Sequence, residues 1–331
     1  MMQFTPKPFT PFQWLPGANG QSIGAALLRS KQGITFHRQR LTTPDDDFID
    51  LDFSHVTGAD SAITAATPLV LLIHGLEGSA QSRYMLETCR QLAQRGIRAV
   101  GINFRSCSGE MNRQARLYHS GETSDLHLVI NWLRQQYPES PLATVGFSLG
   151  GNILLKYLGE QGEAAHNNLF AAVAVSPPFD LASGDRAMSQ GWGKLYTRMF
   201  LRRLWRKIHL KYDLLQDKID VPRALNARTF REFDDAATAP LHGFTSATDY
   251  YTQSSCGQFL PEIRLRTFIL RALDDPFFGN SPIPHHSIAD NNAITAHFTA
   301  NGGHVGFMTD TREFWAEQQA ANFIAAAAHY I

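Results

Sequence analysis

Short, wholly apolar runs alternate along the chain with longer segments in which apolar residues recur every three or four positions. The runs at 69–73, 141–145 and 170–175 have the length of strands buried on both faces, as in the centre of a parallel sheet. The segment 122–137 carries its apolar residues on one side and predicts an amphipathic helix. The same reasoning predicts further strands at 100–104, 266–271 and 294–298 and further helices at 84–95, 152–158 and 311–330.

Two regions interrupt this alternation. Residues 1–67 contain only scattered β-like segments between proline and aspartate clusters, and we interpret them as an antiparallel edge with an irregular arm. Residues 181–250 contain helical stretches and polar turns without a convincing buried strand. Alternating strands and helices predict an α/β protein with a doubly wound, mostly parallel sheet. The core then comprises residues 1–180 and 251–331, and residues 181–250 form a helical cap inserted over the site.

Composition excludes several classes of protein. The 331 residues carry 30 basic and 30 acidic side chains, so no overall field favours nucleic acid or an anionic membrane. The three cysteines, Cys89, Cys107 and Cys256, lack metal-ligand spacing and are odd in number, which favours reduced thiols in a cytoplasm. The first 16 residues lack the apolar region of a signal peptide, and no run reaches the ~18 apolar residues of a spanning helix.

The chemistry is expected where the strand at 141–145 meets the next helix. Gly146 and Gly150 flank Ser148 in a Gly-x-Ser-x-Gly pattern, which at a strand-to-helix junction is the nucleophile elbow of the α/β-hydrolase fold. The turn strains the serine backbone, and glycine is needed two residues away on each side. The alternative is a serine in a glycine-rich turn that serves only packing. A dinucleotide site is excluded because Gly-x-Gly-x-x-Gly is absent.

A serine nucleophile needs a base and an orienting carboxylate, which in this fold follow it in the order acid, then histidine. Asp274 and Asp275 follow the predicted strand at 266–271. Asp275 is favoured because Pro276 disfavours helical backbone at the residue before it, while Asp274 stays the alternative, with a capping role otherwise. His304 lies in a glycine-rich loop after the predicted strand at 294–298 and is the candidate base.

The oxyanion hole needs two backbone N–H donors. Leu149, directly after the nucleophile, supplies one, and Leu76 in the loop after the first buried run is expected to supply the other. His74 is expected to order this loop and is a candidate to line the pocket. The two adjacent histidines at 285–286 have no further metal ligand at usable spacing. We therefore expect neither a metal nor a cofactor.

Several longer motifs carry a narrower resemblance. The chain resembles the YheT-like hydrolases of the AB hydrolase type 4 family, whose eukaryotic members include acylglycerol lipases and medium-chain fatty acid ethyl ester synthases/esterases. The matching segments are 74–79, 105–112, 118–123, 146–152, 231–235, 274–277 and 302–307. The resemblance implies a serine carboxylesterase or lipase-like enzyme with the triad Ser148, Asp275 and His304. Where members show a histidine shortly before a glutamine, this chain has Asn19-Gly20-Gln21-Ser22, a departure expected to concern the arm and not the chemistry.

Charged residues in these motifs have two interpretations. Arg105 and Glu110 follow a strand at the carboxyl edge of the sheet, where ligands bind, so they are candidates to line the pocket. A structural ion pair that holds their loop is the interpretation we favour. Arg231 and Asp234 are likewise expected to act as a structural latch between cap and core.

Residues 186–212 contain eight basic and no acidic residues, interleaved with apolar ones near helical spacing. A cap helix with a solvated basic face explains this pattern. Alternatively, the helix around 194–211 makes peripheral contact with anionic lipid.

The residues together predict a cytoplasmic serine esterase that acts on small-molecule carboxylic esters with an apolar acyl chain. Nucleic acid is not expected as a partner. An acyltransferase that passes the acyl group to an alcohol is one alternative. A non-catalytic protein that binds lipid or a partner on the same fold is the other.

Overall fold

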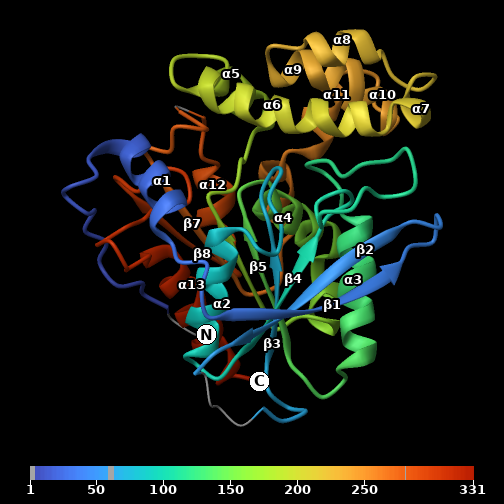
Figure 1. Ribbon diagram of the computed structural model, residues 1–331. Coiled ribbons are helices and arrows are strands. Elements are labelled where there is room, and N and C mark those ends of the chain that lie inside the picture. The colour runs from blue at the N-terminus through green and yellow to red at the C-terminus, as the bar shows by residue number, and fades with distance from the viewer. Residues whose placement is uncertain (1–3, 59–62, 280) are drawn as a thin grey trace.

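A computed structural model of the protein describes residues 4–58, 63–279 and 281–331 (Figure 1). Eight strands of the described residues form one sheet, and their bounds are β1 (Ile34–Thr42), β2 (Phe48–Val56), β3 (Leu69–Ile73), β4 (Arg98–Asn103), β5 (Leu142–Phe147), β6 (Ala171–Val175), β7 (Thr267–Ala272) and β8 (Ile294–Thr299). Their order in the sheet is β1-β2-β4-β3-β5-β6-β7-β8. The pairs β1–β2 and β2–β4 are antiparallel and the other neighbours are parallel, which confirms the predicted α/β class.

Helices cover both faces of the sheet. Helices α3 (Ser124–Gln136) and α4 (Leu149–Gln161) pack on one face, and α2 (Arg83–Ala93) and α13 (Trp315–Ala328) pack on the other. The remaining elements of the core are the 3₁₀ turns η1 (Gly162–Asn167) and η3 (Cys256–Glu262) and the short helix α12 (His285–Ala289). The predicted strands and helices of this core therefore all occur, with ends shifted by a few residues.

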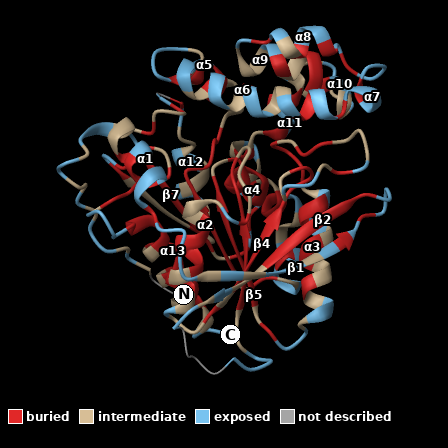
Figure 2. Cartoon of the chain, viewed as in Figure 1, coloured by how far each residue is buried: buried red, intermediate tan, exposed pale blue. Residues whose placement is uncertain are grey.

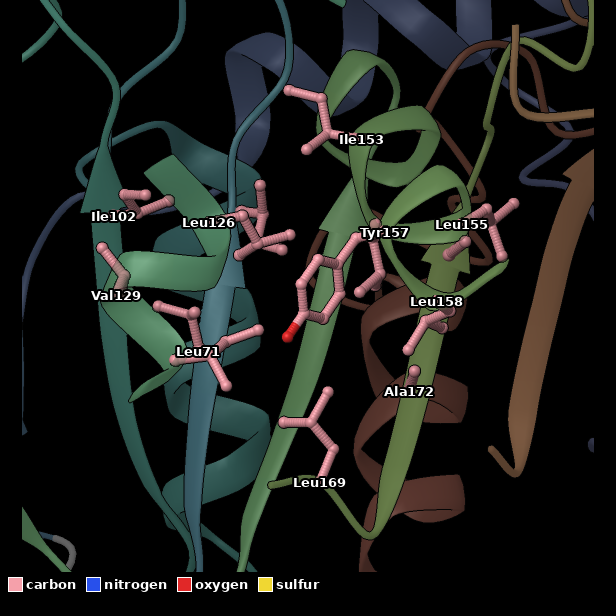
Figure 3. Close-up of a cluster of buried hydrophobic side chains, with 14 of the residues drawn as sticks. Leu71, Ile102, Leu126, Val129, Ile153, Leu155, Tyr157, Leu158, Leu169 and Ala172 are labelled. Atoms are coloured by element: carbon pink, nitrogen blue, oxygen red, sulfur yellow. The ribbon is translucent and has the colours of Figure 1, made fainter. Parts of the chain in front are cut away.

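Strand β3 illustrates why a central strand of this sheet can be apolar at every position. Leu71 contributes to the cluster beneath α3 and α4, while Leu72 contributes to the cluster beneath α2 and α13. Figure 3 shows Leu71 facing Val129 of α3, with Tyr157 of α4 beside them. All five residues of β3 are buried, and Figure 2 shows the buried sheet between helices whose outer faces are exposed. A strand between two helical layers has no solvent-facing side on which polar residues would alternate.

Residues 181–254, which we call the helical segment, lie beyond the carboxyl ends of the parallel strands (Figure 1). The segment encloses its own apolar cluster, in which Leu201, Ile208 and Phe233 are buried. Its helices are α5 (Leu181–Met188), α6 (Gly193–Leu210), α7 (Tyr212–Leu215), α8 (Val221–Asn226), α9 (Phe230–Phe233), α10 (Ala239–Leu241) and α11 (Ala247–Ser254), with a π-helical turn η2 (Asp234–Thr238). Because α11 runs through residue 250, the expected boundary of the insertion falls inside a helix.

The N-terminal region is more ordered than expected. Strands β1 and β2 form the predicted antiparallel edge, but residues of the expected irregular arm form a helix, α1 (Gly17–Leu28). Three glycines in 12 residues disfavour a helix by propensity. Packing favours one of them, because a Cβ on Gly20 would lie 3.0 Å from the backbone carbonyl carbon of Leu15 and 3.1 Å from its oxygen. Tertiary contact therefore overrides the local preference here.

None of the helices in the described ranges is both long enough and apolar enough to cross a bilayer.

Candidate active site

Ser148 lies in a sharp turn between β5 and α4. Its φ of 52° and ψ of −120° place a non-glycine residue in a strained backbone conformation, which persists only where the surroundings enforce it. Packing enforces it here, since a Cβ on Gly146 would lie 2.5 Å from Gly150 O, and one on Gly150 would lie 2.4 Å from Ile73 O. The geometry is that of the predicted nucleophile elbow, with the serine at the N-terminus of a helix.

Ser148, His304 and Asp275 form a continuous chain of hydrogen bonds. Ser148 Oγ lies 2.9 Å from His304 Nε2, and His304 Nδ1 lies 2.8 Å from Asp275 Oδ2. The second carboxylate oxygen of Asp275 accepts a 2.9 Å hydrogen bond from Phe277 N–H, so the carboxylate is held at both oxygens. With the Nδ1 proton donated to Asp275, His304 Nε2 is left to accept the proton of the serine hydroxyl.

Asp274 does another task. Its Oδ1 accepts a 2.9 Å hydrogen bond from Gly303 N–H, one residue before His304, and burial raises the pKa of its carboxyl. Asp274 therefore holds the backbone of the histidine loop, while the neighbouring Asp275 contacts the imidazole itself.

Two phenylalanines confine the imidazole of His304. The Phe277 ring stacks on it with centroids 3.9 Å apart, and the Phe278 ring meets it edge-on at 5.2 Å. Both follow Asp275 in sequence, so one short segment after β7 supplies the carboxylate and two walls of the histidine site. Their role was not foreseen from the sequence, although they directly follow the Asp-Asp-Pro motif.

A cavity of about 800 Å³ opens above Ser148 and His304, between the sheet and the helical segment. The apolar part of its wall comes from distant parts of the chain, and includes Ile23, Leu27, Leu76, Met199, Phe200, Leu204, Phe277 and Phe278. A cavity of this size encloses a drug-sized or lipid-like molecule.

The loop after β3 approaches the nucleophile closely, since a Cβ on Gly75 would lie 3.2 Å from Ser148 Cβ. In this loop Gly75 N–H donates to Tyr84 Oη at 2.9 Å and Glu77 N–H donates to Tyr118 Oη at 2.7 Å. Between them, the N–H of Leu76 has no acceptor among the described residues. Leu149 begins α4, where the amide has no partner within the helix. Both residues line the cavity.

The three residues expected as candidates to line the pocket are absent from the described residues of its wall. His74 is buried, lies with Nδ1 2.7 Å from Gly75 O, and accepts from Phe104 N–H at 3.2 Å through Nε2. Burial lowers the pKa of His74 to about 4, so the ring is neutral and orders the loop. Glu110 is exposed and pairs with Arg40 at 2.7 Å.

Arg105 is the buried centre of an ionic cluster. Its guanidinium lies 2.8 Å from Asp45, 2.9 Å from Asp47 and 2.8 Å from Asp125. Asp45 and Asp47 belong to the turn between β1 and β2, so the N-terminal hairpin is tied to the loop after β4. The favoured interpretation of Arg105, a structural ion pair, is therefore confirmed, and Arg105 is not among the described residues that line the cavity.

Arg231 and Asp234 were expected to latch the cap to the core, but both contact other helices of the helical segment. Arg231 Nε lies 3.6 Å from Asp185 Oδ2 of α5, and Asp234 accepts a 2.7 Å hydrogen bond from Tyr251 Oη of α11. These contacts join helices of the helical segment to one another. Burial raises the pKa of Asp234 to about 7. The segment is instead tied to the sheet side by α6, where Lys207 Nζ lies 2.7 Å from Glu77 Oε1 in the loop after β3.

Helix α1 supplies site residues that sequence reasoning missed. Ser22 Oγ accepts a 2.8 Å hydrogen bond from His304 N–H, and Gln21 Oε1 accepts one of 2.8 Å from Met308 N–H. Residues 21 and 22, in the segment where the departure was expected to concern only the arm, therefore contact the loop that carries His304. No local signal marks these contacts, since they join residues more than 280 positions apart.

Comparison with known proteins agrees with this geometry. Residues 68–311 match the family described as alpha/beta hydrolase fold. The chain is 35% identical to the protein named "Putative esterase YheT" of Escherichia coli (strain K12), over 96% of this chain and 92% of that protein. It is 28% identical to "Phospholipase ABHD3" of Mus musculus, over 91% of this chain and 73% of that protein.

Among solved structures, the esterase Pf2001 of Pyrococcus furiosus has a similar fold, with a TM-score of 0.57 at 14% identity over 98% of this chain and 99% of that one. The chain therefore belongs to the α/β-hydrolase fold family and, within it, to the YheT-like hydrolases.

Proposed function

We propose that this protein is a serine hydrolase that cleaves carboxylic esters with an apolar acyl chain. The observation that carries the proposal is the chain of hydrogen bonds from Ser148 Oγ through His304 to Asp275, at 2.9 and 2.8 Å, beneath a cavity of about 800 Å³. A strained serine, an imidazole and a buried carboxylate, hydrogen-bonded in this order, are the groups that acyl transfer through a serine nucleophile requires.

In the proposed reaction, His304 Nε2 takes the hydroxyl proton as Ser148 Oγ attacks the ester carbonyl. The N–H groups of Leu76 and Leu149 stabilise the oxyanion of the tetrahedral intermediate. The intermediate collapses as His304 returns the proton to the departing alcohol, leaving an acyl group on Ser148. A water molecule, deprotonated by His304, then releases the carboxylic acid, while Asp275 keeps the imidazole oriented in both steps.

The apolar acyl group is supported by the cavity wall. The rings of Phe200 and Phe277, together with Leu204, offer surface that a short polar ester would leave in contact with water. Each methylene transferred from water to such a wall gains about 0.8 kcal/mol. We further propose that the helical segment acts as the cap of this cavity, since Met199, Phe200 and Leu204 of α6 form part of the wall.

Labelling with a fluorophosphonate probe tests the nucleophile. The wild-type protein should be labelled and Ser148→Ala should not, with circular dichroism showing that the variant is folded. Lack of labelling in the wild type would favour the non-catalytic binding protein.

A panel of p-nitrophenyl esters of graded acyl length then tests the substrate class, and loss of all activity above C4 would contradict an apolar acyl site. Product analysis in ethanol–water mixtures distinguishes an esterase from an acyltransferase. An esterase releases chiefly the free acid, whereas an acyltransferase yields chiefly the ethyl ester.

We also propose peripheral membrane contact through α6. Trp192, directly before α6, and Leu195 in its first turn are 61% and 59% exposed, and Arg198, Arg202 and Arg206 are exposed further along the helix. Apolar and basic residues on one exposed helix suit the interface of an anionic bilayer. Ile23 and Leu27 of α1 are exposed and also line the cavity, which extends the apolar surface to its other side.

Flotation with phosphatidylcholine vesicles, with and without phosphatidylglycerol, tests this contact. The wild type should float more with the anionic lipid, and the double variant Trp192→Ser/Leu195→Ser should float less than the wild type. Equal flotation with both vesicles, or none with either, would contradict the proposal.

A further inference from the structure

The loop that carries His304 has an unfavourable backbone. Val305 and Phe307 have φ values of 50° and 46°, in the left-handed region that side chains with a Cβ rarely adopt, and Val305 is β-branched. Gly302 and Gly303 have φ values of 145° and 62°. A segment with this backbone keeps its shape only where neighbouring groups hold it. The position of the imidazole therefore depends on what the loop contacts.

Helix α1 provides most of the polar contacts on one side of this loop. His304 N–H donates to Ser22 Oγ at 2.8 Å, and Ser22 in turn donates its hydroxyl proton to Ala18 O at 2.7 Å. Because that proton is used within α1, the lone pairs of Ser22 Oγ are free to accept from His304. The helix thus presents an oriented acceptor to the backbone of the residue that bears the imidazole.

Two more side chains from this region hold the loop further along. Gln21 Oε1 accepts from Met308 N–H at 2.8 Å. Arg29, directly after α1, donates through Nη2 to Val305 O at 2.7 Å and to Gly306 O at 3.2 Å. Arg29 is itself fully buried and paired with Glu317 of α13 at 2.6 Å. The backbone of His304 and of the residues that follow it is therefore bonded to α1 or to Arg29, whereas the N–H of the preceding Gly303 donates to Asp274 Oδ1.

The contact between helix and loop is also close. A Cβ on Gly303 would lie 2.3 Å from Ala18 O, and one on Gly306 would lie 2.8 Å from Gln21 O. The loop is pressed against the backbone of α1 with room for hydrogen atoms only. Any shift of α1 would therefore be transmitted directly to the backbone that carries the imidazole.

We propose that α1 sets the position of the His304 imidazole relative to Ser148, with Ser22 as a positioning residue. The inference rests on the proposed serine-hydrolase function. Ser22→Ala removes the acceptor for His304 N–H and fills no new space. Because a displacement of about 1 Å in a reacting group costs about 100-fold in rate, we expect kcat to fall about 10- to 100-fold. Ser22 itself lines the cavity, but Ser22→Ala removes only one oxygen atom from that wall, so KM should change less than about 3-fold.

The test compares Ser22→Ala with Ser22→Thr, which keeps a hydroxyl, and with Ser30→Ala, an exposed serine just beyond the helix. Each variant is measured for kcat and KM on a p-nitrophenyl ester, for the rate of fluorophosphonate labelling, and for Tm. Rates are divided by the concentration of active sites from titration, so a partly unfolded sample does not count as a slow one. We expect slow turnover and slow labelling per active site in Ser22→Ala, recovery in Ser22→Thr, and wild-type values in Ser30→Ala.

Two outcomes would overturn the inference. One is a wild-type kcat and labelling rate per active site in Ser22→Ala. The other is a lower Tm as its only change, which would make Ser22 a stabilising residue without influence on the imidazole. A failure of the proposed function would look different, because the wild type itself would then neither hydrolyse the ester nor react with the probe.

Discussion

Lys207 of α6 and Glu77 of the loop after β3 form a buried ion pair, with Nζ 2.7 Å from Oε1 and side chains only 10% and 4% exposed. Glu77 has a φ of 54° and follows Leu76, whose N–H we assign to the oxyanion hole. Tyr118 Oη donates to the same carboxylate oxygen at 2.8 Å. The pair therefore connects the helical segment to the backbone on which the proposed chemistry depends.

Lys207→Met is expected to leave the Glu77 carboxylate buried without its cation. Breaking one side of a buried ion pair costs about 3–5 kcal/mol. Urea unfolding should show this loss, whereas Arg202→Met on the exposed side of the same helix should stay within about 0.5 kcal/mol of the wild type. In the double variant Lys207→Met/Glu77→Gln part of the stability should return. A single variant as stable as the wild type would mean that the pair contributes nothing to holding α6.

The two adjacent aspartates are expected to differ sharply in their effect on turnover. Asp275→Asn removes the carboxylate that orients the imidazole and should lower kcat about 10⁴-fold. Asp274→Asn keeps an oxygen that can accept from Gly303 N–H and should lower kcat by less than about 10-fold. Steady-state kinetics on one p-nitrophenyl ester, with active sites titrated, decides between them. The reverse order of effects would make Asp274 the acid of the triad.

The glycines after the nucleophile are expected to tolerate alanine unequally. A Cβ on Gly150 would lie 2.4 Å from Ile73 O and 2.6 Å from His74 O, both backbone atoms that cannot move aside. Gly150→Ala should therefore lose at least about 1–3 kcal/mol in urea unfolding. At Gly151 the nearest atom is the carbonyl oxygen of Gly146, 3.2 Å away, so Gly151→Ala requires a smaller shift and should cost less than Gly150→Ala. Equal stability of the two variants would show that the elbow is looser than these distances require.

Stability should depend on pH through Asp234, whose pKa burial raises to about 7. The unfolded chain releases this proton near pH 4, so between about pH 4 and 7 the folded state binds more protons. The contribution of this group to stability therefore falls as the pH rises through that range. Asp234→Asn removes the penalty, and its gain in Tm over the wild type should be larger at pH 8 than at pH 4.5. Asp235→Asn is the matched control, and a gain that does not change with pH would contradict the prediction.

The fold and the three central residues could be predicted because each leaves a local mark. Strands buried on both faces are predominantly apolar, and the strained turn at Ser148 demands glycines at fixed spacing. Asp275 and His304 follow two of the later strands, so position in the chain selects His304, and position together with Pro276 favours Asp275 over Asp274.

What could not be predicted depends on pairs of residues far apart in sequence. The sequence indicates an ion pair for Arg105 but does not identify its partners. Asp45 and Asp47 belong to a distant turn that reaches Arg105 only in the folded protein. Helix α1 contains three glycines, which disfavour a helix. It is stabilised by contacts with residues near 305, and no local sequence pattern predicts these contacts. The walls formed by Phe277 and Phe278 depend on the path of the chain after Asp275.

The hydrogen bond between His304 N–H and Ser22 Oγ spans 282 positions of the chain. We expect this contact to form late in folding. A large loop must close, at an entropic cost, before the contact can stabilise the chain. The sheet can assemble while the first and last parts of the polypeptide are still apart, whereas the histidine loop acquires its support only when they meet. During refolding, recovery of the far-ultraviolet dichroism should therefore precede recovery of esterase activity.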